Sequence, residues 1–287
     1  MFASFSRGFE FLKQSITMAR ADHDLIKPSL MLVGASFLLT LIAIVPMVAV
    51  ALLTTGDAQQ VLLGILGALL IFAQYVLTYF FSGLTVALIY GYITQGDGRM
   101  PEAAAAVRRN IGGILTLAVV STILKLIENA ARNRKSILGS IFAAILEAVW
   151  TTASFFILPA MILENLSLIP AVKRSAQMIK NNLLLVGVSY VGVSAVTGLI
   201  GFVAFLAALF LGGIIGYAIA QLSVVVGIVL AVLIVGTAMA LLSAASSYIT
   251  TAYYTCLYMW ARNVEQTGGA SGQQVPAPAP LAAVLAR

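Results

Sequence analysis

Charged residues are scarce in this sequence: Asp, Glu, Lys and Arg together make up 9% of its 287 residues. No charged residue occurs from position 28 to 56, from 58 to 96, or from 181 to 261. A soluble domain of this length needs far more charge on its surface. Uncharged apolar runs of about 18 residues or more are typical of helices that cross a bilayer. The scarcity therefore excludes a soluble globular protein and predicts a polytopic membrane protein.

Cysteine and histidine occur once each, as Cys256 and His23. One cysteine cannot form an intrachain disulfide or a cysteine-rich metal site. His23 lies between two aspartates, but adjacent helical residues point in different directions and no second histidine completes a ligand set. The simpler hypothesis is that Asp22 or Asp24 caps the first turn that leads into the first span. The sequence also lacks a phosphate-binding loop and a nucleophile–base arrangement. We therefore expect no metal, no cofactor and no enzymatic activity.

Apolar residues dominate instead, at 61% of the chain, with a mean hydropathy of +1.04. They predict an all-α polytopic membrane protein with about six transmembrane helices, paired as three hairpins. The predicted spans are residues 29–53, 61–93, 110–126, 137–163, 183–211 and 221–250. The stretch "GGIIG", from Gly212 to Gly216, is predicted to turn the chain between the last two spans.

Three short segments repeat an apolar spacing of three or four residues, which places the apolar side chains on one face of a helix. The three stripes are Phe2, Phe5, Phe9, Leu12 and Ile16; more loosely Met100, Ala103, Val107, Ile111 and Ile114; and Ile169, Val172, Ala176, Ile179 and Leu183. Each segment comes immediately before an odd-numbered span. The chain is therefore predicted as three units, each an interfacial amphipathic helix followed by a hairpin. The third such helix, about residues 170–181, is expected to hold the last hairpin against the membrane surface.

The basic residues are unevenly distributed over this topology, with 12 of the 16 Lys and Arg on one side and 4 on the other. Because Lys and Arg accumulate on the cytoplasmic side, we expect both termini and all three interfacial helices to be cytoplasmic, in a cell inner membrane. The other four lie in or beside the tip between spans three and four, so that hairpin is expected to cross either fully or in part. The predicted domains are an interfacial helix at 1–27, a transmembrane domain at 28–262 and a disordered tail at 263–287.

Glu147 lies inside the fourth predicted span, where an unsatisfied carboxylate costs about 3 kcal/mol. In an antiparallel hairpin that turns near Asn133, Lys125 comes within about one helical turn of the level of Glu147. Two hypotheses follow for this pair: a structural ion pair or hydrogen-bonded acid, or a site that carries protons or substrate. On the cytoplasmic side, a second group of residues is expected to contact anionic lipid headgroups. These are Arg108, Arg109, Lys173, Arg174 and Lys180.

Three stretches of the sequence resemble, in order, the signature stretches of an uncharacterised bacterial membrane family of unknown function with about six spans. They are "FSRGFEFLKQSITMARADHDLIKPSLM", "TTASFFILPAMILENLSLIPAVKRSAQMIKNN" and "YYTCLYMWA". The resemblance covers most of residues 4–262 and is sharpest between Pro159 and Ser175. A looser likeness to that block recurs in the membrane domain of glycerophosphodiester phosphodiesterases, whose catalytic domain is separate and has no counterpart here. The resemblance implies the architecture and no reaction.

The scarcity of polar groups inside the spans, together with the surface-lying helices, predicts a non-enzymatic scaffold, accessory or lipid-organising component. The alternative is a transporter or permease for a small or lipophilic solute, which would use Glu147 together with Lys125 and the glycines of span five. Membrane lipids are the expected partners, and other membrane proteins or further copies of the chain remain open. Nucleic acid is not expected, because the net charge of +6 is small and scattered.

Overall fold

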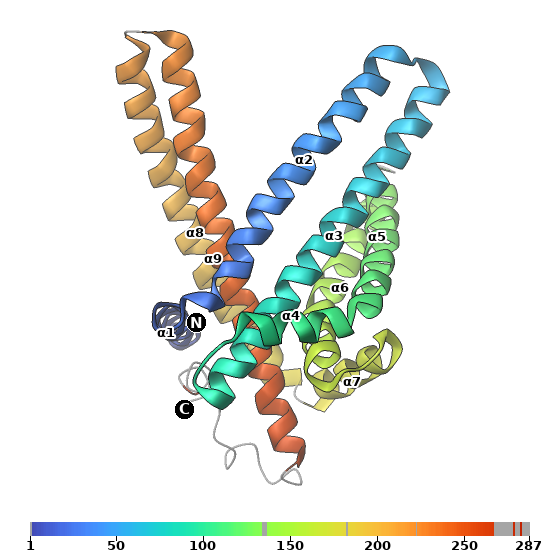
Figure 1. The fold of residues 1–287 in the computed structure, drawn as a ribbon, viewed down its shortest axis with the longest axis vertical. Helices are drawn as coiled ribbons and strands as arrows, with labels where there is room; N and C mark the ends of the chain where they lie inside the picture. The colour runs from blue at the N-terminus through green and yellow to red at the C-terminus, as the bar shows by residue number, and fades with distance from the viewer. Residues whose placement is uncertain are drawn as a thin grey trace. The chain divides into compact units, whose positions relative to one another are not determined.

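The computed structural model describes residues 2–133, 137–181, 183–221 and 223–266, together with Pro278 and Ala282. Every regular element within the four ranges is a helix (Figure 1). The helices are α1 (Phe2–Ala21), η1 (His23–Leu25), α2 (Lys27–Leu53), α3 (Gly56–Gln95), α4 (Met100–Arg109), α5 (Ile111–Asn133), α6 (Ile137–Glu164), α7 (Leu168–Asn181), α8 (Leu183–Ala220) and α9 (Val224–Gln266). Six of the described helices are long and apolar enough to cross a membrane. The predicted all-α polytopic class is confirmed.

Long helices and short amphipathic helices alternate along the chain in a fixed order. The pairs α2–α3, α5–α6 and α8–α9 form the three hairpins, and the shorter helices α1, α4 and α7 come before them. The chain divides into two compact units, each described by itself below: residues 1–30 with 182–287, and residues 31–181.

In the unit of residues 31–181, α5 and α6 pack against each other and against the second half of α3 (Figure 1). Small residues bring these helices close together. A Cβ added at Gly83 of α3 would lie 3.4 Å from Ile162 Cδ1 of α6, and one added at Gly113 of α5 would lie 2.5 Å from Met161 Cε of α6. In lipid, where apolar side chains gain little by leaving the solvent, such close packing drives helix association.

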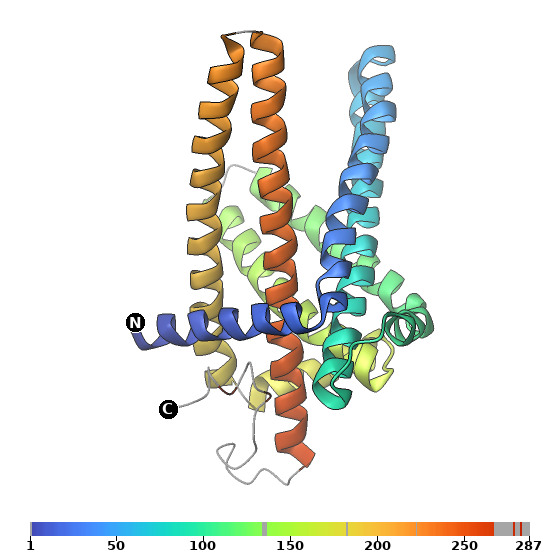
Figure 2. The same cartoon turned by 60° about the vertical axis from the view of Figure 1, so that its left-hand side comes forward.

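In the other unit, α1 crosses the α8–α9 hairpin (Figure 2). The Phe11 ring packs edge-on against Tyr253 of α9, with ring centroids 5.3 Å apart. Tyr248 of α9 donates a hydrogen bond to the backbone carbonyl of Ser15, at 3.1 Å. An apolar contact and a buried polar contact therefore fix α1 on the hairpin.

The three amphipathic helices share one docking rule: each buries residues at positions i, i+4 and i+7. The buried sets are Phe11, Ser15 and Met18 in α1; Ala103, Val107 and Asn110 at α4; and Ala171, Ser175 and Met178 in α7. The sequences "KQSITMAR" (13–20) and "KRSAQMIK" (173–180) repeat the pattern in identities as well. The middle helix buries part of its predicted stripe. In α1 and α7, Phe9, Ile16 and Ile169 of the predicted stripes are exposed, whereas Leu12 is buried. Each of these two helices therefore docks on protein with one face and exposes apolar side chains on another.

Each amphipathic helix packs on other helices of its own compact unit. α7 packs on α6 and α5, which come before it in the chain. Likewise α4 packs mainly on α3, and α1 packs on α8 and α9. Each helix therefore rests on the preceding hairpin, with α1 taking the last hairpin as its partner.

The prediction of a turn at Gly212–Gly216 was wrong. α8 continues through these glycines to Ala220, and α9 begins at Val224. A Cβ added at Gly216 would lie 2.7 Å from Ala231 Cβ and 2.9 Å from the Gly227 carbonyl oxygen. The glycines therefore let α8 and α9 approach closely. A glycine stays helical in lipid because no water is present to replace its backbone hydrogen bonds.

The last helix is longer than its predicted span. α9 runs on through the aromatic stretch and past the expected start of the tail at residue 263, to Gln266. Tyr254, Tyr258 and Trp260 are buried, and burial of large aromatic side chains stabilises this part of the helix. The remainder of the predicted tail lies outside the described residues, apart from Pro278 and Ala282.

Candidate functional site

Four charged residues of the α5–α6 hairpin gather into one cluster. Lys125, Glu128 and Arg132 follow each other at spacings of three and four residues, so they share one face of α5. Lys125 Nζ lies 2.9 Å from Glu128 Oε2, and Arg132 Nε lies 2.9 Å from Glu128 Oε1. One carboxylate therefore binds the cation before it and the cation after it on the same helix.

Glu147 of α6 closes the cluster into a ring. Arg132 Nη2 lies 2.6 Å from Glu147 Oε2, and Lys125 Nζ lies 3.6 Å from Glu147 Oε1. Each cation thus contacts both carboxylates, and the two positive and two negative charges cancel. A neutral, closed set of pairs is the arrangement in which charges are tolerated within an apolar helix pair.

The ring lies toward the α5–α6 turn. From Glu147 to Glu164, where α6 ends, the helix rises about 26 Å at ~1.5 Å per residue. A hydrocarbon core is about 30 Å thick, so the ring lies near the far end of the crossing. The side chain of Glu128 is only 4% exposed, whereas those of Glu147 and Arg132 are 47% and 48% exposed. Glu128 is the enclosed member of the ring, and Glu147 lies at its open edge.

A second polar group lies beside the ring and ties three helices together. Ser121 of α5 is fully buried and donates to the Leu117 carbonyl oxygen at 2.9 Å. Its oxygen lies 2.6 Å from the Tyr79 hydroxyl of α3 and accepts from Trp150 Nε1 of α6 at 2.9 Å. Because the Ser121 proton is already used, Tyr79 is the donor in its pair. Ser121 is the polar hub of this helix interface.

A small cavity separates the hub from the ring. Its volume is about 50 Å³, and Tyr75, Lys125, Glu147 and Trp150 are among the residues that line it. Space of this size holds one or a few water molecules. Sites for organic ligands have about 300–1,000 Å³, so the cavity is too small for an organic solute.

Sequence reasoning identified two of the four ring members and missed the other two, Glu128 and Arg132. Their spacing from Lys125, at i+3 and i+7, was a readable signal, since it places all three on one helical face. The hub at Ser121 had no comparable signal, because serine, tyrosine and tryptophan occur in many spans.

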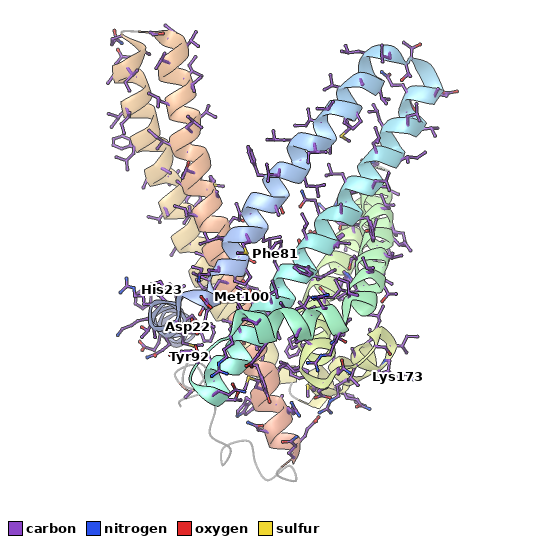
Figure 3. The ribbon with its side chains drawn as sticks, viewed as in Figure 1. Asp22, His23, Phe81, Tyr92, Met100 and Lys173 are labelled. Atoms are coloured by element: carbon purple, nitrogen blue, oxygen red, sulfur yellow. The ribbon has the colours of Figure 1, made fainter. Side chains whose placement is uncertain are left out.

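The residues predicted to meet lipid headgroups divide into two groups. Arg108 and Arg109, at the end of α4, and Lys173 and Lys180, on α7, are exposed (Figure 3 labels Lys173). Arg174 is different, because its Nε lies 3.3 Å from Glu164 Oε2 and its side chain is only 25% exposed. Four cations therefore face outward, and the fifth links α7 to the end of α6.

Two asparagines hold the amphipathic helices α4 and α7 at a fixed spacing. Asn110, which ends α4, donates from Nδ2 to Asn165 Oδ1 at 3.1 Å. Asn165, between α6 and α7, has a φ of +53°, a left-handed conformation that asparagine tolerates better than most residues. The end of α4 is therefore tied to the link between α6 and α7 within one compact unit.

Nearby, Arg99 is bound within its own loop. It donates from Nε to Asp97 and from Nη1 to Glu102, both at 3.2 Å. These two hydrogen bonds raise the pKa of the Arg99 guanidinium, and the bond to Asp97 has the larger effect. Its charge is therefore satisfied by protein groups and is not directed to the outer surface of α4.

The aspartates beside the single histidine have local structural contacts. Asp22 Oδ1 accepts a hydrogen bond from the Asp24 N–H at 2.9 Å, which caps the short helix η1, and Asp24 pairs with Lys27. Figure 3 shows Asp22 and His23 at this link between α1 and α2. Within the described part of the chain, no group of three or more His, Cys, Asp or Glu is placed to hold a metal ion.

Residues 65–269 match a family of unknown function, DUF6159, and this range covers more than two thirds of the chain. It includes the ring, the Ser121 hub, α4 and α7. No curated protein matches the sequence. The chain belongs to the family of unknown function DUF6159.

Proposed function

We propose that this protein is a non-enzymatic component of the cell inner membrane that organises anionic lipids, with both termini cytoplasmic. The observation that carries the proposal is the set of exposed cations on α4 and α7. Each exposed Lys or Arg near a membrane surface attracts anionic lipid by about 1 kcal/mol. Four such residues, Arg108, Arg109, Lys173 and Lys180, are exposed on two helices tied together by Asn110 and Asn165.

The outer face of α7 combines apolar and basic residues. Ile169 is 70% exposed, and Val172 and Ala176 are exposed beside Lys173, while Ala171 and Met178 on the opposite face are buried. An exposed face with apolar and cationic side chains is suited to the boundary between acyl chains and headgroups. This mixture supports lipid rather than bulk water as the outer neighbour of α7.

The α4 helix offers a second place for a headgroup. Arg109 lines a hollow of about 220 Å³ between α3, α4 and α6, together with Tyr90, Gln95 and Arg99. Hydrogen-bond donors on these side chains suit a phosphate or a glycerol. The hollow supports lipid binding at α4 as well as at α7.

The charge ring supports a structural role better than a transport role. A carboxylate that carries protons or substrate needs access and a charge that can change, whereas Glu147 is bound by two cations in a neutral ring. The adjoining cavity of about 50 Å³ has no room for a solute. The alternative, a permease that uses Glu147, is supported by the half exposure of that side chain.

The likeness of residues 159–175 to the membrane domain of glycerophosphodiester phosphodiesterases belongs to this proposal only as a likeness of membrane segments. It supports no reaction. A scaffold or accessory role toward other membrane proteins is compatible with the same basic surface, because gathered anionic lipid can itself attract basic partners.

The test is lipid clustering in vesicles. The full chain is reconstituted in phosphatidylcholine vesicles containing pyrene-labelled phosphatidylglycerol, and the excimer signal reports how closely the anionic lipid is gathered. The wild type should raise the signal, and a variant with Arg108, Arg109, Lys173 and Lys180 all replaced by Gln should lose most of the increase. Lys27→Gln is the matched control, because it removes an exposed cation that Asp24 already binds and that lines neither the hollow nor the outer faces of α4 and α7. An equal signal from the quadruple variant and the wild type would contradict the proposal.

A further inference from the structure

A pocket of about 490 Å³ lies where α1 crosses the α8–α9 hairpin. Its walls come from three helices of one compact unit: Leu12 of α1, Gly201 and Phe202 of α8, and a face of α9 that includes Met239 and Thr250. The volume is within the range of about 300–1,000 Å³ found for ligand sites. The pocket shares no residue with the charge ring or with the basic surface of α4 and α7.

The surface of α9 shows where this pocket lies in the membrane. Large apolar side chains are exposed from Val224 to Leu241, and α9 is then mostly buried from Ala244 onward. α1 contacts α9 at Tyr248 and Tyr253. From Val224 to Tyr248 the helix rises about 36 Å at ~1.5 Å per residue, slightly more than the ~30 Å of a hydrocarbon core. This distance places α1 at one membrane surface and the α8–α9 turn at the other.

The pocket then occupies one leaflet. Along α9 its lining extends from Met239 to Thr250, which is about 17 Å. Half of a hydrocarbon core is about 15 Å. The pocket therefore begins at α1 and reaches the depth at which the acyl chains of that leaflet end.

Two glycines create much of this space. A Cβ added at Gly198 or Gly201 of α8 would meet no atom within 4 Å. Most of the pocket's lining side chains are apolar, and in a bilayer the molecules around the pocket are lipids. The apolar group that membrane lipids can place in the pocket is an acyl chain.

Free hydroxyls line the same pocket. Ser243, Ser246 and Thr250 lie on one face of α9, and none of the three takes part in a hydrogen bond among the residues that the structure describes. Hydroxyls in other spans behave differently: Thr40, Thr78 and others donate to the carbonyl four residues earlier. The hydroxyls in the pocket remain available to the ester and glycerol oxygens of a lipid.

Positive charge is available at the surface end of the pocket. α1 contains Arg7, Lys13 and Arg20 but only one acidic residue, Glu10, which accepts a hydrogen bond from Gln14 at 3.1 Å. Lys13 follows the pocket residue Leu12 and is exposed. A lipid whose chain entered the pocket would have its headgroup at the level of α1, beside these cations.

We propose that the α1/α8/α9 pocket binds one acyl chain of an anionic glycerophospholipid from the leaflet on which α1 lies. Gly198 and Gly201 leave space for the acyl chain. The hydroxyls of Ser246 and Thr250 donate hydrogen bonds to the ester oxygens, and Lys13 selects the anionic headgroup. This site holds a single lipid at fixed stoichiometry, unlike the dispersed headgroup contacts of α4 and α7. Because the two surfaces share no residue, either can fail without the other.

The test is native mass spectrometry of the full chain, released from detergent after titration with dipalmitoyl phosphatidylglycerol. The wild type should retain one lipid at concentrations where further lipids are lost. Gly201→Leu fills the pocket and should weaken retention at least tenfold. Gly213→Leu is the matched control, because Gly213 lies on the same helix, is equally free of neighbours and is not part of the pocket. It should retain the lipid as the wild type does.

Further measurements compare lipids with different headgroups, and a second pocket-filling variant is available if the first one misfolds. Phosphatidylcholine should bind about fivefold more weakly than phosphatidylglycerol, the effect of one basic side chain near an anionic headgroup, and Lys13→Gln should remove that preference. Ser243→Leu fills the pocket from α9 and replaces Gly201→Leu if that variant melts early. No single retained lipid in the wild type would overturn the proposal, as would undiminished retention in a folded pocket-filling variant. Equal retention of free palmitic acid and phosphatidylglycerol would also overturn it.

Discussion

The two carboxylates of the charge ring should differ sharply in their contribution to stability. Glu128 is almost completely enclosed and contacts both cations, so Glu128→Leu leaves Lys125 and Arg132 facing each other around an apolar side chain. Removing one partner of a buried charge pair costs about 3–5 kcal/mol. Glu147 contacts the same cations, but its side chain is half exposed. Solvent and headgroups can replace it there, so Glu147→Leu should cost about 1 kcal/mol.

The assay is reversible unfolding of the purified full chain in mixed detergent micelles of increasing SDS content, with the free energy of unfolding obtained for each variant. Glu128→Gln and Glu147→Gln keep the shape and remove only the charge, and they should show the same order with smaller losses. In double-mutant cycles, Glu147 should couple more strongly to Arg132, at 2.6 Å, than to Lys125, at 3.6 Å. A larger loss at Glu147 than at Glu128 would refute the assignment of Glu128 as the enclosed member. A Glu147→Gln variant that unfolds normally but does not complement a deletion would favour the transporter alternative.

Three other perturbations test particular contacts. Gly216→Leu should destabilise the α8–α9 hairpin by about 1–3 kcal/mol in the same unfolding assay, because its Cβ would meet Ala231 and the Gly227 carbonyl, and Gly213→Leu should cost much less. Asn165→Ala should lower stability by about 1–2 kcal/mol, since it loses the bond to Asn110 and leaves alanine at a φ of +53°; an unchanged free energy would show that the tie is unimportant. A cysteine at Gln221, with Cys256 replaced by Ala, should react with a membrane-impermeant maleimide from outside intact cells, and labelling only after lysis would contradict the proposed topology.

The sequence predicted the architecture because its main signals are long and redundant. Uncharged runs defined the helices, and the charged segments between them separated the hairpins. The glycines of α8 were misread because local propensity favours a turn at "GGIIG", whereas in lipid the backbone keeps its helical hydrogen bonds and glycine permits close packing. The turn was therefore predicted at Gly212–Gly216, about two helical turns before the observed turn at Gln221.

The amphipathic helices show a different limit. Stripes through Phe9 and Ile169 were readable from the spacing, but α1 and α7 each have one face that packs on protein and another that is exposed, and both faces contain apolar residues. Only tertiary contact reveals that Ser15 and Ser175 lie at the centre of the docked faces. The repeated sequences around these two serines were visible in the printed sequence, and the structure supplies their meaning.

The ring at the α5–α6 turn was half predictable. An acid inside a span requires a partner, which led from Glu147 to Lys125. The number and order of the partners depended on side-chain reach: Arg132 lies farther along α5, yet its long side chain approaches Glu147 more closely than Lys125 does. Spacing along one helix places cations on a face, but it does not determine which of them reaches a neighbouring helix.

The central claim, that α7 rests on protein with one face and on lipid with the other, is tested most directly by a spin label at Ala176 of the reconstituted full chain. This position is exposed and lies opposite the buried Met178 face. The account predicts that the label relaxes readily with oxygen, which concentrates in the acyl region, and poorly with a water-soluble nickel chelate. A label at Ala171 should be screened from both reagents. Fast relaxation by the nickel chelate and slow relaxation by oxygen at position 176 would place α7 in water and contradict the account.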